Sequence, residues 1–263
     1  MSLETQAPGR DDLHRPGTLR VVGIGPGNPL DRTRRCEAAI AASRVLMGYA
    51  PYLDSVKDLW GDRTVERSGM RKEVDRCREA ILRTRSGEDV ALLCSGDAGV
   101  YGMAGLVLEI LHEEGDSLPL EIVPGVTAAN AAGAALGAPL MLDYAVVSLS
   151  DLLVPWDRIC HRLDCLARSG LAVVVYNPRS KGRVHQIEEA REIFLRHRAP
   201  DTPVAVVTAA STPEETRDIS TLDGFLELEI GMRSVVVFGG SQAQVLGDFL
   251  VERRGYAGKY ELA

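Results

Sequence analysis

The sequence contains little that would suit a membrane, a nucleic acid or a disulfide framework. It has no run of about 18 uncharged apolar residues, so we expect no membrane-spanning helix. Its net charge of −7 opposes nonspecific binding to nucleic acid and to acidic membrane surfaces, and an anionic ligand would need a local basic cluster. The five cysteines form no C-x-x-C pair, and their odd number favours a reducing cytoplasm over an oxidising compartment.

Two further local features are weak signals. The stretch 1–18 is polar and lacks the apolar core of a secretory signal, so it is predicted to be a flexible tail. Cys160 and Cys165 flank His161, but zinc-type spacing is missing. The spacing of these three residues is more typical of a helix that carries small, half-buried side chains, and we expect no metal site there.

Apolar runs of strand length alternate with helix-length amphipathic stretches. Strands are predicted at 19–24, 45–47, 90–94 and 120–123, and again at 145–148, 171–176, 204–208 and 234–238. The segment 133–139, rich in Gly, Ala and Pro, is a candidate hinge. This alternation predicts parallel sheets covered by helices. We expect two α/β domains, 19–138 and 139–263, with the active site in the cleft between them.

The first predicted strand ends in a glycine loop, Gly23 to Pro29 (GIGPGNP). Its G-x-G-x-G spacing differs from the dinucleotide fingerprint G-x-G-x-x-G, and Leu46 to Tyr49 stand where that fingerprint expects an acid. The prolines also remove N–H donors that a pyrophosphate would use. The loop therefore argues against a nicotinamide or flavin cofactor, although an ordinary tight turn stays possible. A P-loop is excluded because the chain has no G-x-x-x-x-G-K-[ST].

Three more loops follow predicted strands, where ligands of open α/β sheets bind. In Ser95 to Gly102 (SGDAGVYG), Asp97 could cap the next helix, or the loop could form a backbone cradle. In Pro124 to Asn130 (PGVTAAN), Thr127 could be an N-cap, and the alanines permit close packing of a helix or a flat ligand. Tyr176 to Arg183 (YNPRSKGR) carries three cations in five residues, either a solvated face or an anion-facing loop.

Taken together, the four loops resemble those of the tetrapyrrole methylases, the S-adenosylmethionine (SAM)-dependent enzymes of cobalamin and sirohaem biosynthesis. The motifs V-G-x-G-P-G, S-G-D-x-G-V-Y-G, P-G-V-T-A-A and Y-N-P occur in order over most of the chain. Further stretches, at 68–70, 95–109, 137–156, 176–183 and 254–256, are similar to the branch that methylates C17 of precorrin-3B or cobalt-precorrin-3. The S-G-D-A-G and Y-N-P-R-S-x-G-R runs favour the anaerobic, cobalt-first enzymes.

The resemblance implies a two-domain class III SAM methyltransferase fold, with a Rossmann-like parallel-sheet N-terminal domain and a mixed-sheet α/β C-terminal domain, usually as a homodimer. It implies SAM as cofactor, released as S-adenosylhomocysteine, and held largely by main-chain groups. The implied cofactor contacts fall on Pro26, Ser95, Gly96, Asp97, Val100, Thr127, Ala128, Tyr176, Asn177, Ala205 and Val236. The stretch 209–212 departs from the basic residues of relatives, so no role is assigned there.

The implied reaction is methylation at C17 of a tetrapyrrole, with contraction of the macrocycle. A sulfonium is already a strong electrophile, so such a transfer depends on in-line orientation and electrostatics and requires no metal. Candidates for proton movement are Asp97, Tyr101, Ser148 and Ser150, although the group 148–151 could simply cap a helix. The substrate's carboxylates would meet Arg71, Lys72, Arg179, Lys181 and Arg183. Asp151 is a further candidate for contact with the substrate.

Three alternatives are considered from the sequence. A noncatalytic ligand-binding protein that retains the fold is opposed by the intact loops. A sibling methylase acting at C11 or C20 would share these loops, because pocket shape sets the position of methylation. A nucleotide-binding oxidoreductase is more remote, since the glycine spacing and the missing acid oppose it.

Overall fold

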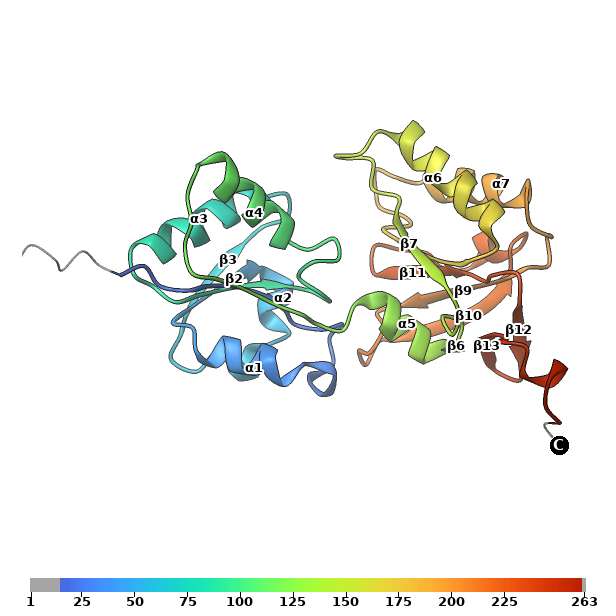
Figure 1. The fold of residues 1–263 in the computed structure, drawn as a ribbon, viewed down its shortest axis with the longest axis horizontal. Coiled ribbons are helices and arrows are strands. Elements are labelled where there is room, and N and C mark those ends of the chain that lie inside the picture. The colour runs from blue at the N-terminus through green and yellow to red at the C-terminus, as the bar shows by residue number, and fades with distance from the viewer. Residues whose placement is uncertain (1–14, 262–263) are drawn as a thin grey trace, which may run out of the picture. The chain divides into compact units, whose positions relative to one another are not determined.

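The computed structural model describes residues 15–261 and divides after Thr127 into two compact units (Figure 1). Of the predicted tail, residues 1–14 lie outside the described residues. The last two residues of the predicted tail, Gly17 and Thr18, are hydrogen-bonded to the first unit. The N–H of Gly17 donates to the carbonyl of Thr84 at 2.9 Å, and the N–H of Thr18 donates to Asp89 Oδ1 at 3.0 Å. The predicted tail therefore extends too far, because residues 17 and 18 pack on the first unit.

The first unit contains a parallel sheet of order β3-β2-β4-β1-β5. Its strands are β1 (Leu19–Gly23), β2 (Val45–Tyr49), β3 (Thr64–Ser68), β4 (Val90–Cys94) and β5 (Leu120–Val123). Its helices are α1 (Arg34–Ala41), α2 (Ala50–Asp54), α3 (Glu73–Arg85) and α4 (Ala104–Glu113). Apolar side chains of α3 and α4 pack on one face of the sheet and those of α1 on the other (Figure 1).

The second unit begins with α5 (Ala128–Leu136) and contains a mixed sheet of order β10-β9-β11-β8-β7. Its strands are β7 (Tyr144–Ser148), β8 (Ala172–Tyr176), β9 (Pro203–Thr208), β10 (Thr216–Thr221) and β11 (Ser234–Phe238). A smaller sheet joins β6 (Gly137–Ala138), β12 (Ala243–Leu246) and β13 (Phe249–Glu252). Helices α6 (Trp156–Ser169) and α7 (Gln186–Leu195) contribute to one core, and α5 to another.

Four single-turn 3-10 helices complete the described elements, at Pro29–Asp31, Lys57–Leu59, Phe225–Glu227 and Tyr256–Gly258. The predicted α/β class is confirmed, with a parallel Rossmann-like sheet followed by a mixed one. In the mixed sheet, β7 and β8 are parallel, and β11 is antiparallel to both β8 and β9. Strands β7, β8 and β9 therefore share one direction, and their carboxyl ends lie at one edge.

The boundary between the units lies at 127/128, earlier than the predicted 138/139. Helix α5 belongs to the second unit because its alanine face packs into the core of that unit. Ala129 and Ala132 are buried in one cluster with Ala205 and Val237. The predicted hinge at 133–139 instead forms the end of α5 and strand β6, which pairs with β13.

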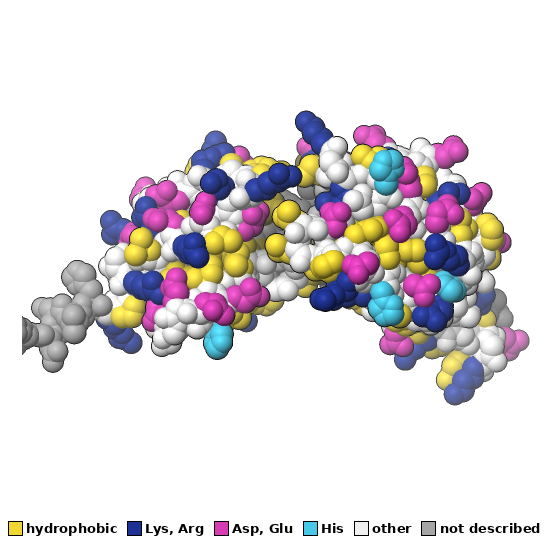
Figure 2. Space-filling view, turned by 90° about the horizontal axis from the view of Figure 1, so that it is seen from above, with side chains coloured by type: hydrophobic (Ala, Val, Ile, Leu, Met, Phe, Trp, Pro, Cys, Tyr) yellow, Lys and Arg dark blue, Asp and Glu magenta, His cyan; other side chains and the backbone are white. Residues whose placement is uncertain are grey.

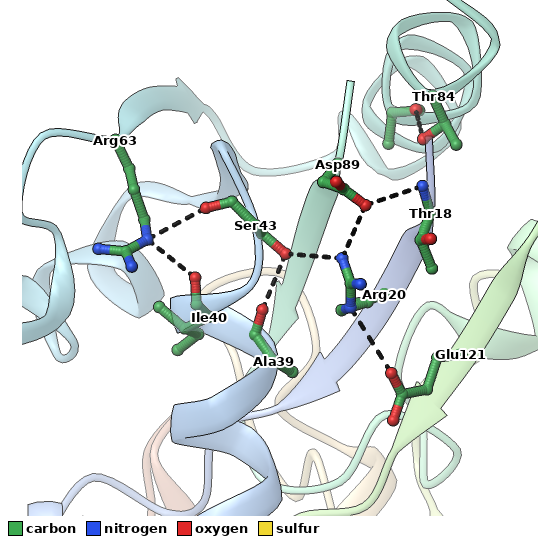
Figure 3. A network of polar contacts seen from close by, with 10 residues as sticks. Thr18, Arg20, Ala39, Ile40, Ser43, Arg63, Thr84, Asp89 and Glu121 are labelled. Carbon is green, nitrogen blue, oxygen red and sulfur yellow. Dashed lines mark hydrogen bonds and ion pairs between the residues drawn. The ribbon is translucent and has the colours of Figure 1, made fainter. Parts of the chain in front are cut away.

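Polar contacts occupy the amino-terminal edge of the parallel sheet (Figure 3). Arg20 donates to Asp89 Oδ1 at 3.1 Å and to Ser43 Oγ at 3.4 Å, and its Nε lies 3.6 Å from Glu121. Ser43 Oγ donates in turn to the carbonyl of Ala39 at 2.8 Å. The side chains at this edge are thus used for structural contacts. A ligand site is expected at the opposite, carboxyl edge of the sheet.

The surface mixes charges of both signs. Acidic and basic side chains alternate over both units on the face shown in Figure 2. Within residues 15–261, no helix combines the length and the apolar character needed to cross a bilayer.

Candidate functional site

Three glycine loops of the first unit meet at the carboxyl edge of its sheet. The N–H of Gly96 donates to the carbonyl of Gly25 at 2.8 Å, and the reverse bond is 3.1 Å long. A Cβ on Gly125 would lie 2.1 Å from the Gly96 carbonyl oxygen, and one on Gly23 would lie 2.7 Å from that oxygen. These glycines are therefore required by the contact of one loop with another, because a side chain at either position would collide with a backbone carbonyl.

Asp97 connects two of these loops. Its Oδ1 accepts a hydrogen bond from the N–H of Gly99 at 2.7 Å, and its Oδ2 accepts one from the N–H of Gly125 at 2.9 Å. Helix α4 starts at Ala104 with Met103 at its N-cap, so Asp97 does not cap that helix. Both oxygens of the carboxylate accept hydrogen bonds from main-chain N–H groups. Asp97 therefore fits the role of positioning these two loops better than the acid–base role considered from the sequence.

Small and exposed groups surround this junction. Ser95 is exposed, and Pro26 and Thr127 are half-buried. Val100 and Tyr101 present apolar surface directly after the loop, with exposed fractions of 37% and 56%. The first unit therefore offers main-chain groups and apolar side chains to a ligand at this edge.

The thiol at the end of β4 is not a nucleophile. Burial raises the pKa of Cys94 to about 11, so the sulfur stays protonated near neutral pH. Its Sγ accepts a hydrogen bond from the N–H of Met103 at 3.4 Å. Cys94 therefore serves the packing of the loop.

The second unit brings together the loops after β7 and β8 and the start of α5. Tyr176 Oη accepts a hydrogen bond from the N–H of Ala129 at 2.7 Å, in the first turn of α5. Ser148 Oγ accepts one from Asn177 Nδ2 at 3.0 Å and another from the N–H of Ser150 at 3.1 Å. Three residues predicted for the site, Ser148, Ser150 and Asn177, thus lie in one hydrogen-bonded cluster. Tyr176 ends β8 directly before Asn177 and connects that strand end to α5.

The basic loop of the second unit uses part of its charge internally. Arg183 donates from Nε and Nη2 to the carbonyl of Asn177, at 3.2 and 2.9 Å. Arg179 lies 3.5 Å from Glu188, and its Nε is buried without a hydrogen-bond partner among the described residues. Lys181 is exposed. Of the three cations in this loop, Arg183 therefore stabilises the loop itself, because it is hydrogen-bonded to the carbonyl of Asn177.

The remaining predicted substrate residues lie after β3 and β7. Arg71 is exposed with a φ of 62°, and Lys72 pairs with Asp75 at 3.0 Å. Asp151 Oδ2 accepts a hydrogen bond from Gln186 Nε2 at 3.0 Å. Arg71 and Lys72 thus lie at the carboxyl edge of the first sheet, and Asp151 at the corresponding edge of the second.

Two predicted cofactor residues lie in the interior of the second unit's sheet. Ala205 and Val236 are fully buried in the middle of β9 and β11. Their side chains pack in the two cores of the second unit, with α5 and with α6–α7. These buried side chains offer no surface to a ligand, and the assignment of Ala205 and Val236 to the cofactor stays a prediction.

Backbone strain marks the same edges. Among residues 15–261, the non-glycine residues with positive φ are Arg71, Tyr101, Asn177, Ala209 and Ser211. Each lies in a loop that follows the carboxyl end of a strand, namely β3, β4, β8 or β9. Such strain is concentrated at ligand sites in proteins. The stretch 209–212, which received no role from the sequence, shares this feature, and no residue pattern there would have revealed it.

One cavity of about 560 Å³ lies elsewhere in the second unit. It is lined by residues at the end of α6, between α7 and β9, and after β11, including Arg168, His197 and Ser241. These segments adjoin the amino end of β9, opposite the loops described above. The cavity is therefore not at the edge where ligands of α/β sheets bind, which is the carboxyl edge that carries the loops.

No group of three or more His, Cys, Asp and Glu side chains that could hold a metal occurs within the described part of the chain. Cys160 and Cys165 lie on α6, as predicted. Cys160 Sγ donates to Glu189 Oε1 at 3.3 Å, while Cys165 Sγ lies 3.9 Å from His161 Nε2.

Comparison with known proteins gives many relatives, of which three are described here. The cobalt-factor III methyltransferase of Priestia megaterium is 41% identical over 94% of this chain, which spans only 46% of that longer protein. The probable cobalt-factor III C(17)-methyltransferase of Salmonella typhimurium is 39% identical, over 90% of this chain and 99% of its own. The precorrin-3B C(17)-methyltransferase of a Sinorhizobium species is 36% identical, over 92% and 98%.

Solved structures agree with these relatives. The methyltransferase CobJ superposes with a TM-score of 0.84 at 33% identity, covering 90% of this chain and 100% of that one. The uroporphyrin-III C-methyltransferase of Thermus thermophilus, crystallised with S-adenosyl homocysteine, gives 0.66 at 26% identity, covering 85% and 97%. The family model for tetrapyrrole (corrin/porphyrin) methylases matches residues 18–225. The chain therefore belongs to the tetrapyrrole methylases, as the order of its four loops indicated.

Proposed function

We propose that this protein is a SAM-dependent C-methyltransferase of cobalamin biosynthesis, which methylates C17 of a precorrin-3-type tetrapyrrole with contraction of the macrocycle. The observation that carries the proposal is the extent of the similarity. Relatives named as cobalt-factor III or precorrin-3B methyltransferases match 90% or more of the chain. Family membership supports a homodimer in the cytoplasm, and sedimentation velocity tests the dimer.

The cobalt-containing substrate is favoured over the metal-free one. Two relatives named for cobalt-factor III are 41% and 39% identical to the chain, against 36% for the relative named for precorrin-3B. Cobalt would then enter as part of the substrate. This agrees with the S-G-D-A-G and Y-N-P-R-S-x-G-R runs of the sequence.

The loops fit SAM as the cofactor. When bound, SAM supplies a methyl group on a positively charged sulfur. In the first unit, we assign its binding to Pro26, Ser95, Gly96, Val100 and Thr127, with Asp97 setting the spacing of the loops. In the second unit, we assign it to Ala128, Tyr176 and Asn177. Strand β2 ends in Gly48 and Tyr49, without the acidic ribose ligand of a dinucleotide site.

The chain's own contribution to the reaction is orientation and proton donation. Loops that are hydrogen-bonded to one another lose little freedom when a ligand binds, which favours in-line geometry. Ser148 Oγ accepts two hydrogen bonds, so both of its lone pairs are used and its O–H remains as a donor. Ser148, with Tyr101 and Ser150, is therefore our candidate for donating a hydrogen bond or proton to an oxygen on the edge of the macrocycle.

The test is methyl transfer observed directly. The purified protein is incubated with ¹³C-methyl-labelled SAM and either cobalt-factor III or precorrin-3B, and the product is examined by mass spectrometry and NMR. A single labelled methyl on C17 supports the proposal, and faster turnover of the cobalt compound supports the preferred substrate. Label at C11 or C20 would instead identify a sibling methylase. Absence of transfer with tight NAD binding would identify an oxidoreductase.

A charge-reversal pair tests which loop meets the substrate. Arg179→Glu should raise KM for the tetrapyrrole roughly tenfold, because an attractive cation becomes a repulsive anion. The Kd for S-adenosylhomocysteine should stay unchanged. Arg196→Glu is the matched control, since Arg196 is exposed at the carboxyl end of α7, whereas the basic loop precedes the amino end of that helix. Equal loss of both affinities in Arg179→Glu would reject this role of the basic loop.

A further inference from the structure

Arg76 is a buried guanidinium in the first unit that the proposed reaction does not yet use. It lies on α3 and is only 5% exposed. Its Nε donates to Ser68 Oγ at 2.5 Å, and its Nη2 donates to the carbonyl of Gly69 at 3.0 Å. Its Nη1 lies 3.4 Å from Met103 Sδ.

The charge of Arg76 is not neutralised locally. In the described part of the chain, no carboxylate lies within ion-pair distance of its guanidinium, and its partners are a hydroxyl, a carbonyl and a thioether. A buried charge without an opposite partner is costly, and a thioether is a weak acceptor. A residue needed only to fill this space could be neutral, so the retained charge suggests a use.

Arg76 is connected, directly or through Ser68, to residues at or after the carboxyl ends of three strands. Ser68 and Gly69 are the end of β3 and the start of the loop that follows it, and Met103 precedes α4 after the β4 loop. Ser68 Oγ also donates to the carbonyl of Gly48, in β2, at 3.0 Å. Strands β3, β2 and β4 are neighbours in the sheet, so one side chain connects their carboxyl ends.

The loop that Arg76 holds carries exposed groups suited to a carboxylated macrocycle. Met70 is 54% exposed, and Arg71 is exposed in a left-handed conformation with a φ of 62°. A strained backbone persists only where its surroundings fix it. The bonds from Arg76 to Ser68 and Gly69 supply such a fixation immediately before Met70.

We propose that Arg76 is a positioning residue for the tetrapyrrole substrate: it fixes the loop 69–72 in the conformation that presents Arg71 and Lys72, and it adds a buried positive charge behind them. This inference rests on the proposed function. A buried charge is screened less by salt than an exposed one, so it attracts an approaching carboxylate more effectively. It does not favour a positively charged sulfonium. The effect should therefore fall on the anionic substrate and not on the cofactor.

The experiment compares four variants of the full chain. Arg76→Gln removes the charge, and Arg76→Lys keeps the charge but loses the fork of donors. Ser68→Ala keeps Arg76 and removes the hydroxyl that accepts from Arg76 and donates to Gly48. Arg78→Gln is the matched control, because Arg78 is exposed on the same helix. For each variant, KM and kcat with cobalt-factor III, the Kd of S-adenosylhomocysteine by calorimetry and the thermal midpoint are measured.

Arg76→Gln should raise KM by at least about tenfold, the effect of losing one charge-assisted contact, with kcat and the S-adenosylhomocysteine Kd within about twofold of wild type. Arg76→Lys and Ser68→Ala should fall between Arg76→Gln and wild type, and Arg78→Gln should match wild type. If Arg76→Gln does not fold, the other two variants carry the test.

An unchanged KM in folded variants, or an equal loss of cofactor affinity, would overturn the assignment and leave Arg76 a packing residue. Such a result, obtained while the wild type still methylates C17, would leave the proposed function intact. Absence of methyl transfer by the wild type would reject the proposed function, and this inference with it.

Discussion

The carboxylate of Asp97 accepts a hydrogen bond from the N–H of Gly125, 2.9 Å away and 28 residues further along the chain. Its other oxygen accepts one from Gly99, so a single side chain ties the loop after β4 to the loop after β5. These loops carry most of the first unit's groups that we assign to the cofactor. Asp97 therefore sets their spacing, and this role needs no contact with the reacting atoms.

Replacement of Asp97 by alanine should weaken cofactor binding and stability together. Two main-chain donors lose their acceptor, which lowers the free energy of unfolding by about 1–3 kcal/mol. We expect the Kd of S-adenosylhomocysteine to rise roughly tenfold by calorimetry, since loops must then be ordered on binding. Asp97→Asn, which retains one acceptor oxygen, should show a smaller effect. Wild-type affinity in Asp97→Ala would show that the loops hold their spacing without this carboxylate.

The contact between loops predicts opposite effects for two glycine-to-alanine changes. In Gly125→Ala, the new Cβ would lie 2.1 Å from a backbone oxygen of Gly96, and the resulting shift should cost about 1–3 kcal/mol of unfolding free energy. In Gly105→Ala, on α4, nothing lies within 4 Å of the new Cβ, and alanine should stabilise the helix by up to about 1 kcal/mol. Urea unfolding measures both. Equal stability of the two variants would contradict the packing described here.

Removal of the Tyr176 hydroxyl should loosen the start of α5. In Tyr176→Phe, the N–H of Ala129 loses an acceptor at 2.7 Å, and the ring is otherwise kept. We expect a loss of about 0.5–1.5 kcal/mol in unfolding free energy and faster amide hydrogen exchange at Ala129. Tyr144→Phe is a suitable control, because Tyr144 is exposed at the beginning of β7. Unchanged exchange at Ala129 would remove the capping role of Tyr176.

Asp89 should make stability fall in acid. Burial raises the pKa of this carboxyl, but hydrogen bonds from Thr18 and Arg20 outweigh burial and hold the pKa below its ordinary value of 3.8. A lowered pKa in the folded state means that the stabilisation is present above the unfolded pKa, and is lost as the pH falls through the folded pKa.

The measurement is the free energy of unfolding in urea at several pH values between 7 and 3. Asp89→Asn should be less stable than wild type at pH 7. The difference should begin to shrink as the pH falls below the ordinary value of 3.8, where the unfolded chain binds a proton at Asp89 before the folded protein does. A difference that stays constant over this range would assign the effect of the substitution to shape and not to charge.

Local patterns in the chain predicted much of this fold. The apolar runs at 19–24 and 90–94 became β1 and β4, since interior strands of a parallel sheet are buried on both faces and thus apolar throughout. The edge strand β3, with the sequence TVERS, was missed because its side chains are partly exposed and mostly polar. Helix α5 was assigned to the wrong unit, because an alanine-rich helix shows no preference for one sheet until both exist.

The candidate site, like the fold, was predicted from the sequence only in part. The residue types and order of the four loops were sufficient to indicate the family, since Gly, Pro and Ala at strand ends expose main-chain groups. The contacts between these glycines and backbone carbonyls join loops that are far apart in the chain. The hydrogen bond from the N–H of Gly125 to Asp97 does so as well. The burial of Ala205 and Val236, and the lone charge of Arg76, likewise follow from three-dimensional packing. Composition and spacing act locally, whereas the partners of a buried polar group are chosen only when distant segments come together.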